Sequence, residues 1–310
     1  MSLRVTFLGT SGAVPTTERN PSAVFLRRDG DAMLFDVGEG TQRQMMRFGT
    51  GFDVEAVFLS HIHGDHVLGL PGLIQTWDFN EREDPLVVYT PHGTRHAVVE
   101  LIHAVGADPS YPVSVEEVAP GEVVRRREDY EVRAVETQHL TPSVGYALVE
   151  DERKGRFDRE RAEELGVPVG PKFSQLHEGT PVELEDGTVI EPAQVVGEPR
   201  PGRRVVYTGD TRPTEEVVAA ASAADLLIHD ATFTADEADR ARETGHSTSV
   251  EAGRVARRAG AKRLVLTHIS SRYAGDTGDL KAEARDAFDG RVVVASDGYE
   301  LTVPYPDEVE

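Results

Sequence analysis

The chain contains no cysteine among its 310 residues. This absence excludes a disulfide framework, a thiolate nucleophile and any cysteine-ligated zinc or iron–sulfur site. No stretch of the sequence approaches the ~18 consecutive apolar residues that a membrane-spanning helix needs. The segment Met1–Gly9 begins as a short alternating strand and lacks the long apolar core of a signal peptide. We therefore expect a soluble, cytoplasmic protein with no membrane partner.

Lysine is scarce as well. Asp and Glu total 54 against 33 Lys and Arg, which gives a formal net charge of −21, and the only lysines are Lys154, Lys172, Lys262 and Lys281. Abundant carboxylate with little lysine resembles the composition of proteins from salt-accumulating halophiles. In ~1 M salt the Debye length is only about 3 Å, so the self-repulsion of such a surface is tolerated there. The same charge weighs against a nucleic-acid partner, which usually leaves a basic surface.

Short apolar segments of two periodicities alternate along the chain, which is typical of a layered α/β protein. The strands that the pattern predicts are Arg4–Leu8, Ala23–Arg27, Ala32–Asp36, Ala56–Ser60, Leu86–Thr90, Val132–Glu136, Gly145–Val149, Arg204–Thr208, Leu226–Asp230, Arg263–Thr267 and Arg291–Ala295. The predicted helices are Gly40–Phe48, Leu70–Asn80, Thr94–Val105, Thr214–Ala221, Ser249–Ala259 and Leu280–Phe288.

One long segment interrupts this alternation. From Asp151 to about Pro201 the chain is charged and then rich in Gly and Pro, without a long periodic apolar run. A stretch of this length inside a compact domain is usually functional or disordered. We therefore expect a single domain over residues 1–310 that carries an insertion at about residues 151–201.

The strongest chemical signal follows the predicted strand Ala56–Ser60 directly. His61, His63, Asp65 and His66 place three imidazoles and one carboxylate within six residues. The carboxyl ends of strands are where α/β folds usually bind ligands. Neutral imidazole and carboxylate suit zinc and related divalent metals. Residues 61 and 63 can point at one ion while residues 65 and 66 point at another.

Three further residues hold the same place relative to a predicted strand. His139, Asp210 and His268 each lie one to three residues beyond a strand end. Taken singly, a His or Asp in such a place is more often a cap or an ordinary loop residue. Together with the first cluster they supply the ~7 protein ligands that two metal ions need.

The order of these motifs resembles the metallo-β-lactamase superfamily, and several loops resemble its ribonuclease Z family in the short form. Leu8–Pro15 followed by Arg19-Asn20 is similar to that family's Pro-X-Lys-X-Arg-Asn loop, with Thr17 in place of the usual lysine. The other segments that resemble the family are Phe35–Gln44, Gly170–Gly179 at the end of its protruding arm, His229–Phe233, which has Asp230 in place of the usual Glu, and His246–Thr248.

The resemblance implies a four-layer αββα sandwich that assembles as a homodimer and holds two Zn²⁺ ions per subunit. The ligands it implies are His61, His63 and His139 for one ion, Asp65, His66 and His268 for the other, and Asp210 as the bridge between them. Asp65 would accept the proton of the attacking water. His246 would protonate or stabilise the departing 3′ oxygen, since imidazole can donate a proton near neutral pH. Whether Asp230 orients His246 stays open at this point.

The function that the resemblance implies is a zinc-dependent endoribonuclease. Such an enzyme removes the 3′ trailer of precursor tRNA and leaves a 3′-hydroxyl on the tRNA and a 5′-phosphate on the trailer. The alternative is a small-molecule phosphodiesterase, arylsulfatase or lactonase on the same binuclear scaffold, and a third reading is a metal-stabilised binding protein without turnover. The insertion at 151–201 favours the nuclease, because a small substrate needs no arm. Which metal is loaded, which precursors are preferred and whether a CCA end blocks cleavage stay open.

The charge generates a prediction about stability. We expect the melting temperature of the protein to rise as potassium chloride increases into the molar range, because screening relieves carboxylate repulsion. Thermal unfolding across a salt series measures this. A melting temperature that stays flat or falls contradicts the halophilic interpretation and leaves the enzymatic one untouched.

Overall fold

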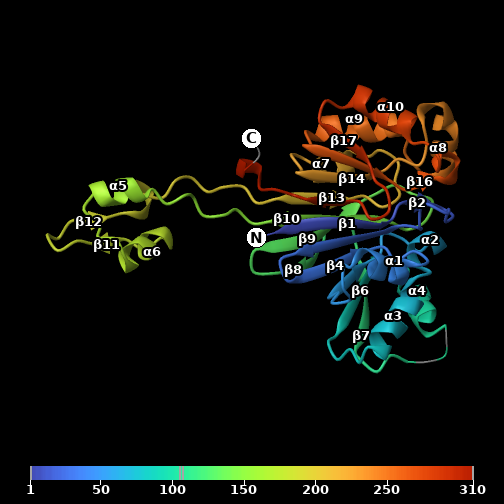
Figure 1. Cartoon of the computed structure of the whole chain (residues 1–310), viewed down its shortest axis with the longest axis horizontal. Helices are drawn as coiled ribbons and strands as arrows, with labels where there is room; N and C mark the ends of the chain where they lie inside the picture. Colours follow the sequence, from blue (N-terminus) through green and yellow to red (C-terminus); the bar gives the residue numbers. More distant parts are fainter. Residues whose placement is uncertain (1, 105, 107, 309–310) are drawn as a thin grey trace. The chain divides into compact units, whose positions relative to one another are not determined.

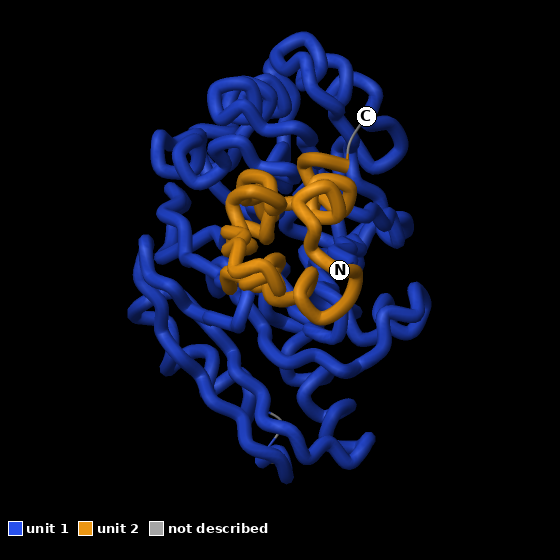
Figure 2. Tube along the Cα trace, turned by 90° about the vertical axis from the view of Figure 1, so that its left-hand side faces the viewer, with its two compact units in different colours: residues 1–149, 203–304 blue, residues 150–202, 305–310 orange. Residues whose placement is uncertain are grey.

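The computed structural model describes residues 2–104, 106 and 108–308, and Figure 1 shows their course. The chain divides into two compact units (Figure 2). Unit 1 is Met1–Val149 with Arg203–Pro304, and unit 2 is Glu150–Gly202 with Tyr305–Glu310. Over the ranges that are described, no helix combines the length and the apolar character that crossing a bilayer requires.

The first sheet of unit 1 has seven strands in the order β18-β1-β3-β4-β5-β6-β7. Its strands are β1 (Leu3–Gly9), β3 (Ala23–Arg28), β4 (Asp31–Phe35), β5 (Ala56–Phe58), β6 (Leu86–Pro91), β7 (Val113–Val118) and β18 (Glu300–Thr302). Strands β4 to β7 run parallel to one another. The helices of this half are α1 (Thr41–Phe48), α2 (Gly64–Val67), α3 (Leu70–Phe79) and α4 (Arg95–His103).

The second sheet also has seven strands, in the order β17-β15-β14-β13-β10-β9-β8. They are β8 (Val123–Arg126), β9 (Tyr130–Glu136), β10 (Val144–Glu150), β13 (Arg204–Tyr207), β14 (Leu226–Asp230), β15 (Arg263–Thr267) and β17 (Arg291–Val294). Its helices are α7 (Glu215–Ala220), α8 (Ala238–Thr244), α9 (Ser249–Ala259) and α10 (Gly278–Ala287). Helix α9 begins with a capping box: the Thr248 hydroxyl accepts a hydrogen bond from the Glu251 amide, and the Glu251 carboxylate accepts one from the Thr248 amide.

Three buried clusters divide unit 1 into layers. One cluster joins residues of both sheets, such as Phe58 and Tyr146, and fills the space between them. A second joins the first sheet to α1, α3 and α4, and a third joins the second sheet to α7, α9 and α10. The order is therefore helices, sheet, sheet, helices, as Figure 1 shows from bottom to top of unit 1. The predicted four-layer αββα sandwich is confirmed.

Unit 2 is built from short elements around a small apolar cluster of its own. They are α5 (Arg159–Glu164), α6 (Pro171–His177), β11 (Val182–Glu183), β12 (Val189–Ile190) and the 3-10 turn η1 (Pro192–Gln194). The buried apolar residues of this cluster are Ala162, Val167, Leu176, Val182, Ile190 and Val195. Each of these short elements buries at most one residue, which explains why the sequence showed no period there.

Every predicted strand and helix occurs, with ends that differ by no more than two residues, apart from Val105, which lies outside the described residues. In unit 1 the pattern missed β7, β8, β18, α8, the four-residue helix α2 and the two-residue strands β2 (Ser11–Gly12) and β16 (Ile269–Ser270). Strands β7 and β8 are the outer strands of their sheets and expose much of their length. Edge strands bury fewer apolar side chains than central ones, so their signal in the sequence is weak.

Candidate metal centre

The predicted ligands come together at one end of unit 1. The possible ligand atoms form three groups, and within each group all of these atoms lie within 4.8 Å of one another. The first group is His61, His63, His139 and Asp210, the second is Asp65, His66 and His268, and the third is Asp210, His246 and His268. The structure therefore places all seven predicted ligands in one cluster and sets His246 beside it.

These side chains stand on loops that follow strands β5, β9, β13 and β15. His61 comes after β5, and the short helix α2 carries Asp65 and His66. The turn after β13 requires glycine, because Gly209 has φ +58° and a Cβ there would lie 2.5 Å from the Cβ of Ser60. This close approach brings the adjacent Asp210 against the loop that carries His61.

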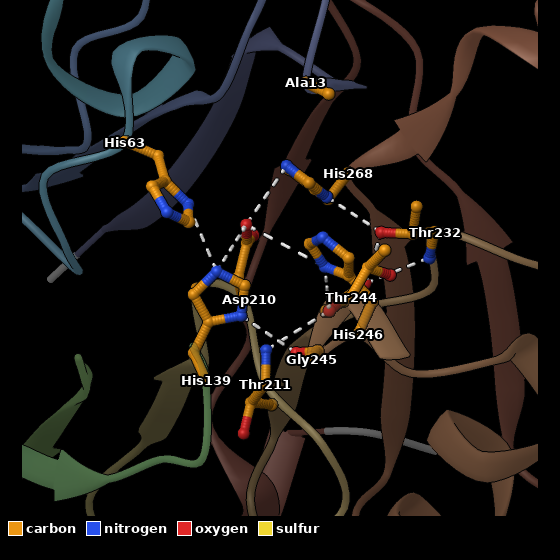
Figure 3. A network of polar contacts seen from close by, with 12 residues as sticks. Ala13, His63, His139, Asp210, Thr211, Thr232, Thr244, Gly245, His246 and His268 are labelled. Carbon is orange, nitrogen blue, oxygen red and sulfur yellow. Dashed lines mark hydrogen bonds and ion pairs between the residues drawn. The ribbon is translucent and has the colours of Figure 1, made fainter. Parts of the chain in front are cut away.

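The ring nitrogens of the histidines face one another across short distances (Figure 3). His63 Nδ1 lies 3.0 Å from His61 Nε2 and 3.2 Å from His139 Nε2. In the second group, His66 Nε2 lies 3.3 Å from His268 Nε2. Such convergence of nitrogen donors is typical of a metal site.

The carboxylate of Asp210 lies between the two groups. Its Oδ2 is 3.5 Å from His61 Nε2 in the first group. The same atom is 3.3 Å from the Nε2 atoms of both His66 and His268 in the second group. One carboxylate therefore faces the donors of both groups.

The opposite nitrogen of four of these rings is held by a neighbour. His66 Nδ1 lies 2.8 Å from Asp36 Oδ2. The other three pairs are His61 Nδ1 with Ser60 Oγ at 3.0 Å, His139 Nδ1 with the Gly245 carbonyl at 2.9 Å, and His268 Nδ1 with Thr232 Oγ1 at 2.8 Å. Metal-binding histidines are held in this way, with one nitrogen on a hydrogen-bond partner and the other toward the ion. In these four residues Nε2 is therefore the nitrogen available to bind an ion. His63 instead turns its Nδ1 toward the neighbouring rings.

Asp36 is held by four hydrogen-bond contacts. Its completely buried carboxylate accepts from the Ser60 amide and hydroxyl, both at 2.7 Å, and from the Tyr207 hydroxyl at 2.5 Å. His66 Nδ1 is its fourth contact. These contacts position His66, a predicted ligand, and no motif of three or four residues could reveal partners so distant in sequence.

Burial and neighbouring charge shift the titration of these residues. Burial lowers the pKa of His61, and the neighbouring His66 lowers it further. Burial alone would raise the pKa of Asp210, but the charges of His268 and His66 hold it well below its ordinary value. The Asp210 carboxylate is therefore an anion, which is the form that binds a metal.

His246 and Asp230 form a pair beside the cluster. His246 Nδ1 lies 3.0 Å from Asp230 Oδ2, so the question left open by the sequence has an answer: the shorter Asp side chain does reach the ring. Asp230 Oδ1 also accepts from the amide and the hydroxyl of Thr232, at 2.9 and 2.7 Å. Burial would lower the pKa of His246, but the Asp230 carboxylate raises it to about 9. The imidazole is therefore protonated at neutral pH.

Asp65 belongs to the second group of ligand atoms and is partly exposed. Its Oδ2 accepts a 2.8 Å hydrogen bond from the Ala13 amide and lies 3.1 Å from His268 Nε2. Burial would raise the pKa of Asp65, but its contacts with His268 and His66 lower it well below the usual range. Asp65 is therefore ionised at neutral pH.

The donor set fits a divalent metal ion. It consists of imidazole nitrogens and carboxylate oxygens, the ligands that zinc and similar ions take in proteins. Asp210 Oδ1 is buried and has no hydrogen-bond partner within the described part of the chain. A buried, unpaired carboxylate oxygen is costly in the absence of a cation, so this atom itself favours a metal at the centre.

The remaining histidines of the first half lie on the surface. His92 and His96 are exposed, with 82% and 87% of their side chains accessible, and His103 is 46% accessible. None of the three belongs to a group of metal-ligand type within the described residues. They contribute nothing to the centre.

Residues 16–268 match the family model described as the metallo-beta-lactamase superfamily. The chain is 67% identical to the ribonuclease Z of Natronomonas pharaonis over 99% of this chain and 100% of that protein. It is 66% identical to the ribonuclease Z of Halobacterium salinarum over 99% of each. Both organisms are halophilic archaea, which agrees with the acidic composition.

Solved structures give the same picture. The short form of human tRNase Z superimposes with a TM-score of 0.70 at 28% identity, covering 97% of this chain and 99% of that one. The metallo-beta-lactamase fold protein YhfI from Bacillus subtilis also reaches 0.70, at 21% identity, with 97% and 100% covered; this second likeness concerns the fold alone. Family model, relatives and fold agree, and the chain belongs to the ribonuclease Z family of the metallo-β-lactamase superfamily.

Proposed function

We propose that this chain is an endoribonuclease that removes the 3′ trailer of precursor tRNA, leaving a 3′-hydroxyl on the tRNA and a 5′-phosphate on the trailer. The observation that carries the proposal is a complete set of metal donors with the His246–Asp230 pair beside it. Relatives named ribonuclease Z align with the whole chain. A substrate made inside the cell agrees with the predicted cytoplasmic location.

We propose further that the centre holds two Zn²⁺ ions. His61, His63 and His139 would hold one, Asp65, His66 and His268 would hold the other, and Asp210 would bridge them. Two ions in such a site activate water and stabilise charge on the attacking and leaving oxygens of an in-line phosphoryl displacement. The position of Asp210 Oδ2 between both groups of nitrogens supports the bridging role.

Two residues would handle protons. Asp65 is ionised, partly exposed and held by the Ala13 amide, so its carboxylate can accept a hydrogen bond from the attacking water and then its proton. His246 is protonated near neutral pH and its ring is fixed by Asp230. It can therefore donate a proton to the departing 3′ oxygen of the tRNA.

Unit 2 is proposed to be an arm inserted in the single domain, and it would bind the body of the tRNA. It has its own apolar cluster and contributes no residue to the groups of metal-ligand type among the described residues. A homodimer, in which the arm of one subunit grips the RNA that the other cuts, is part of this proposal. Because the chain carries a net charge of −21, RNA recognition would depend on local basic groups, on hydrogen bonds and on shape.

The metal prediction concerns Asp210. The purified protein should carry up to two divalent ions per chain, and Asp210→Ala should lose most of the metal and more than ~100-fold of the activity, since a ligand that faces both groups is removed. Elemental analysis and precursor cleavage measure the two effects. Asp225→Ala is the control, because Asp225 is also buried but pairs with Lys262 away from the centre. Activity that survives a chelator in a metal-free protein would refute the proposal.

A second prediction concerns the alkaline limb of the pH–rate profile. Asp230→Asn removes the carboxylate that raises the pKa of His246, so the imidazole should lose its proton at lower pH. Activity should then begin to fall at a lower pH than in the parent, by about one unit or more. Asp230→Glu keeps the charge and should keep the parent profile. An unshifted limb in Asp230→Asn would show that His246 is not the acid.

A third prediction separates the nuclease from a small-molecule hydrolase. Replacing residues 151–201 with a short Gly/Ser link should leave the metal centre intact and reduce precursor cleavage ~100-fold or more, because remote binding energy positions the reacting phosphate. Hydrolysis of bis(p-nitrophenyl) phosphate, if the parent shows it, should survive. Metal content is checked in both proteins. Unchanged precursor cleavage would favour the phosphodiesterase, arylsulfatase or lactonase alternative.

A further inference from the structure

Three arginines of unit 2 converge on one carboxylate that the proposed chemistry does not use. Arg153 pairs with Asp307 Oδ1. Arg200 Nη1 lies 3.2 Å from Asp307 Oδ2, and Arg156 Nη2 lies 3.4 Å from the same atom. The guanidinium carbon of Arg153 also lies 3.4 Å from the centre of the Tyr305 ring. Asp307 is therefore enclosed by three cationic groups.

The backbone holds the first two of these arginines side by side. Arg153 and Arg200 are opposite each other on an antiparallel bridge, with amide-to-carbonyl distances of 2.7 and 2.8 Å in the two directions. The two segments stay close beyond the bridge, because a Cβ on Gly155 would lie 1.8 Å from the Gly197 carbonyl oxygen. The cationic groups are thus brought together by local main-chain structure and not by Asp307 alone.

This cluster differs from the other basic residues of the unit. Arg159 pairs with Glu163 and Arg161 with Glu164, each within one helix. The three clustered arginines instead share Asp307, with Glu308 at 3.9 Å from Arg153 as a weaker partner. Like charges gathered in this way repel one another, so the cluster favours binding of an anion. The Arg156 side chain is 71% exposed, which leaves the cluster open to a large polyanion.

The chemistry of the cluster suits phosphate. Guanidinium groups bind phosphate oxygens through paired N–H donors, and several such forks can share one anion. Asp307 presents two oxygens to the arginines, as the two non-bridging oxygens of a phosphodiester would. It lies in the exposed 3-10 turn η4 (Pro306–Glu308). A turn of this kind can move away without the loss of a helix or a sheet strand.

We propose that Arg153, Arg156 and Arg200 form a binding site for a backbone phosphate of RNA, and that Asp307 occupies this site in the free protein as a competing anion. The identity of the RNA as a tRNA rests on the proposed function. RNA binding at this site displaces Asp307. Breaking the pairs between the arginines and Asp307 costs free energy, which lowers the affinity for RNA. The competition weakens as salt rises, because these charges are accessible to screening ions.

The test compares tRNA binding by the full-length parent and by Asp307→Asn, with fluorescence anisotropy of a labelled tRNA. Removal of the competing charge should tighten binding about threefold to fivefold at low salt, the scale of an exposed ion pair. The gain should shrink toward none at ~1 M salt. Glu83→Gln removes one charge from an exposed site of unit 1, outside the proposed RNA-binding arm, and is the control, which should leave the affinity unchanged.

The arginine side of the site is tested in the same assay. Arg156→Gln should weaken binding at low salt, and adding Asp307→Asn to a variant with all three arginines changed to Gln should no longer tighten it. Since the triple change can disturb the fold, melting temperatures accompany the affinities, and Arg156→Gln alone serves as the exposed, least disruptive variant. A gain from Asp307→Asn that persists without the arginines would overturn the proposal.

Unchanged or weaker binding by Asp307→Asn would overturn it directly, and would identify Asp307 as a structural clamp. Cleavage of precursor tRNA by the parent is measured separately. If the parent cleaves the precursor but Asp307→Asn binds no more tightly, only this inference fails. If Asp307→Asn binds tRNA more tightly but the parent cleaves no precursor, the phosphate site stands and the proposed function fails.

Discussion

The centre depends on a carboxylate that is buried between the two sheets. Asp36 follows β4 in the first sheet, and its partner Tyr207 belongs to β13 in the second. A buried carboxylate is costly unless its oxygens are hydrogen-bonded, and here four donor groups surround it. Since one of the four is His66, the same contacts that join the sheets also orient a predicted ligand. Packing and function cannot be separated at this point of the structure.

The other side chains of the centre lie on loops at the ends of strands, and hydrogen bonds orient them as well. The strands are rigid, and each loop needs to place only one or two side chains. A carbonyl, a hydroxyl or a carboxylate then holds the far side of each ring, as with Gly245 and His139 or Thr232 and His268. Groups fixed in this way lose little conformational entropy when an ion binds, which favours binding. Asp230 extends the arrangement, because it holds Thr232 with one oxygen and His246 with the other.

Charge sets the second constraint on this protein. The 33 Lys and Arg of this RNA-binding enzyme are outnumbered by 54 Asp and Glu, so the positions of the cationic side chains matter more. In unit 2 two arginines are neutralised within helix α5, whereas three others gather around Asp307. The release of counterions from phosphate favours binding of basic side chains, and this contribution falls as salt rises. Preorganised guanidinium groups with hydrogen bonds keep directional contacts that screening affects less.

The sequence by itself determined the layered α/β class and the central strands and indicated the candidate ligands, because period and motif are local properties of the chain. The motif at residues 61–66 can be recognised without a structure. His139, Asp210 and His268 could be recognised as candidates because each follows a predicted strand. The edge strands β7, β8 and β18 and the short elements of unit 2 could not be recognised in the sequence, since each buries too few side chains to show a period. The tertiary structure alone decided the contacts of Asp36 with Tyr207, of Asp230 with His246 and of the arginines with Asp307. These contacts join residues between 16 and 171 positions apart, and only the packing of distant strands and loops brings such groups within hydrogen-bond distance.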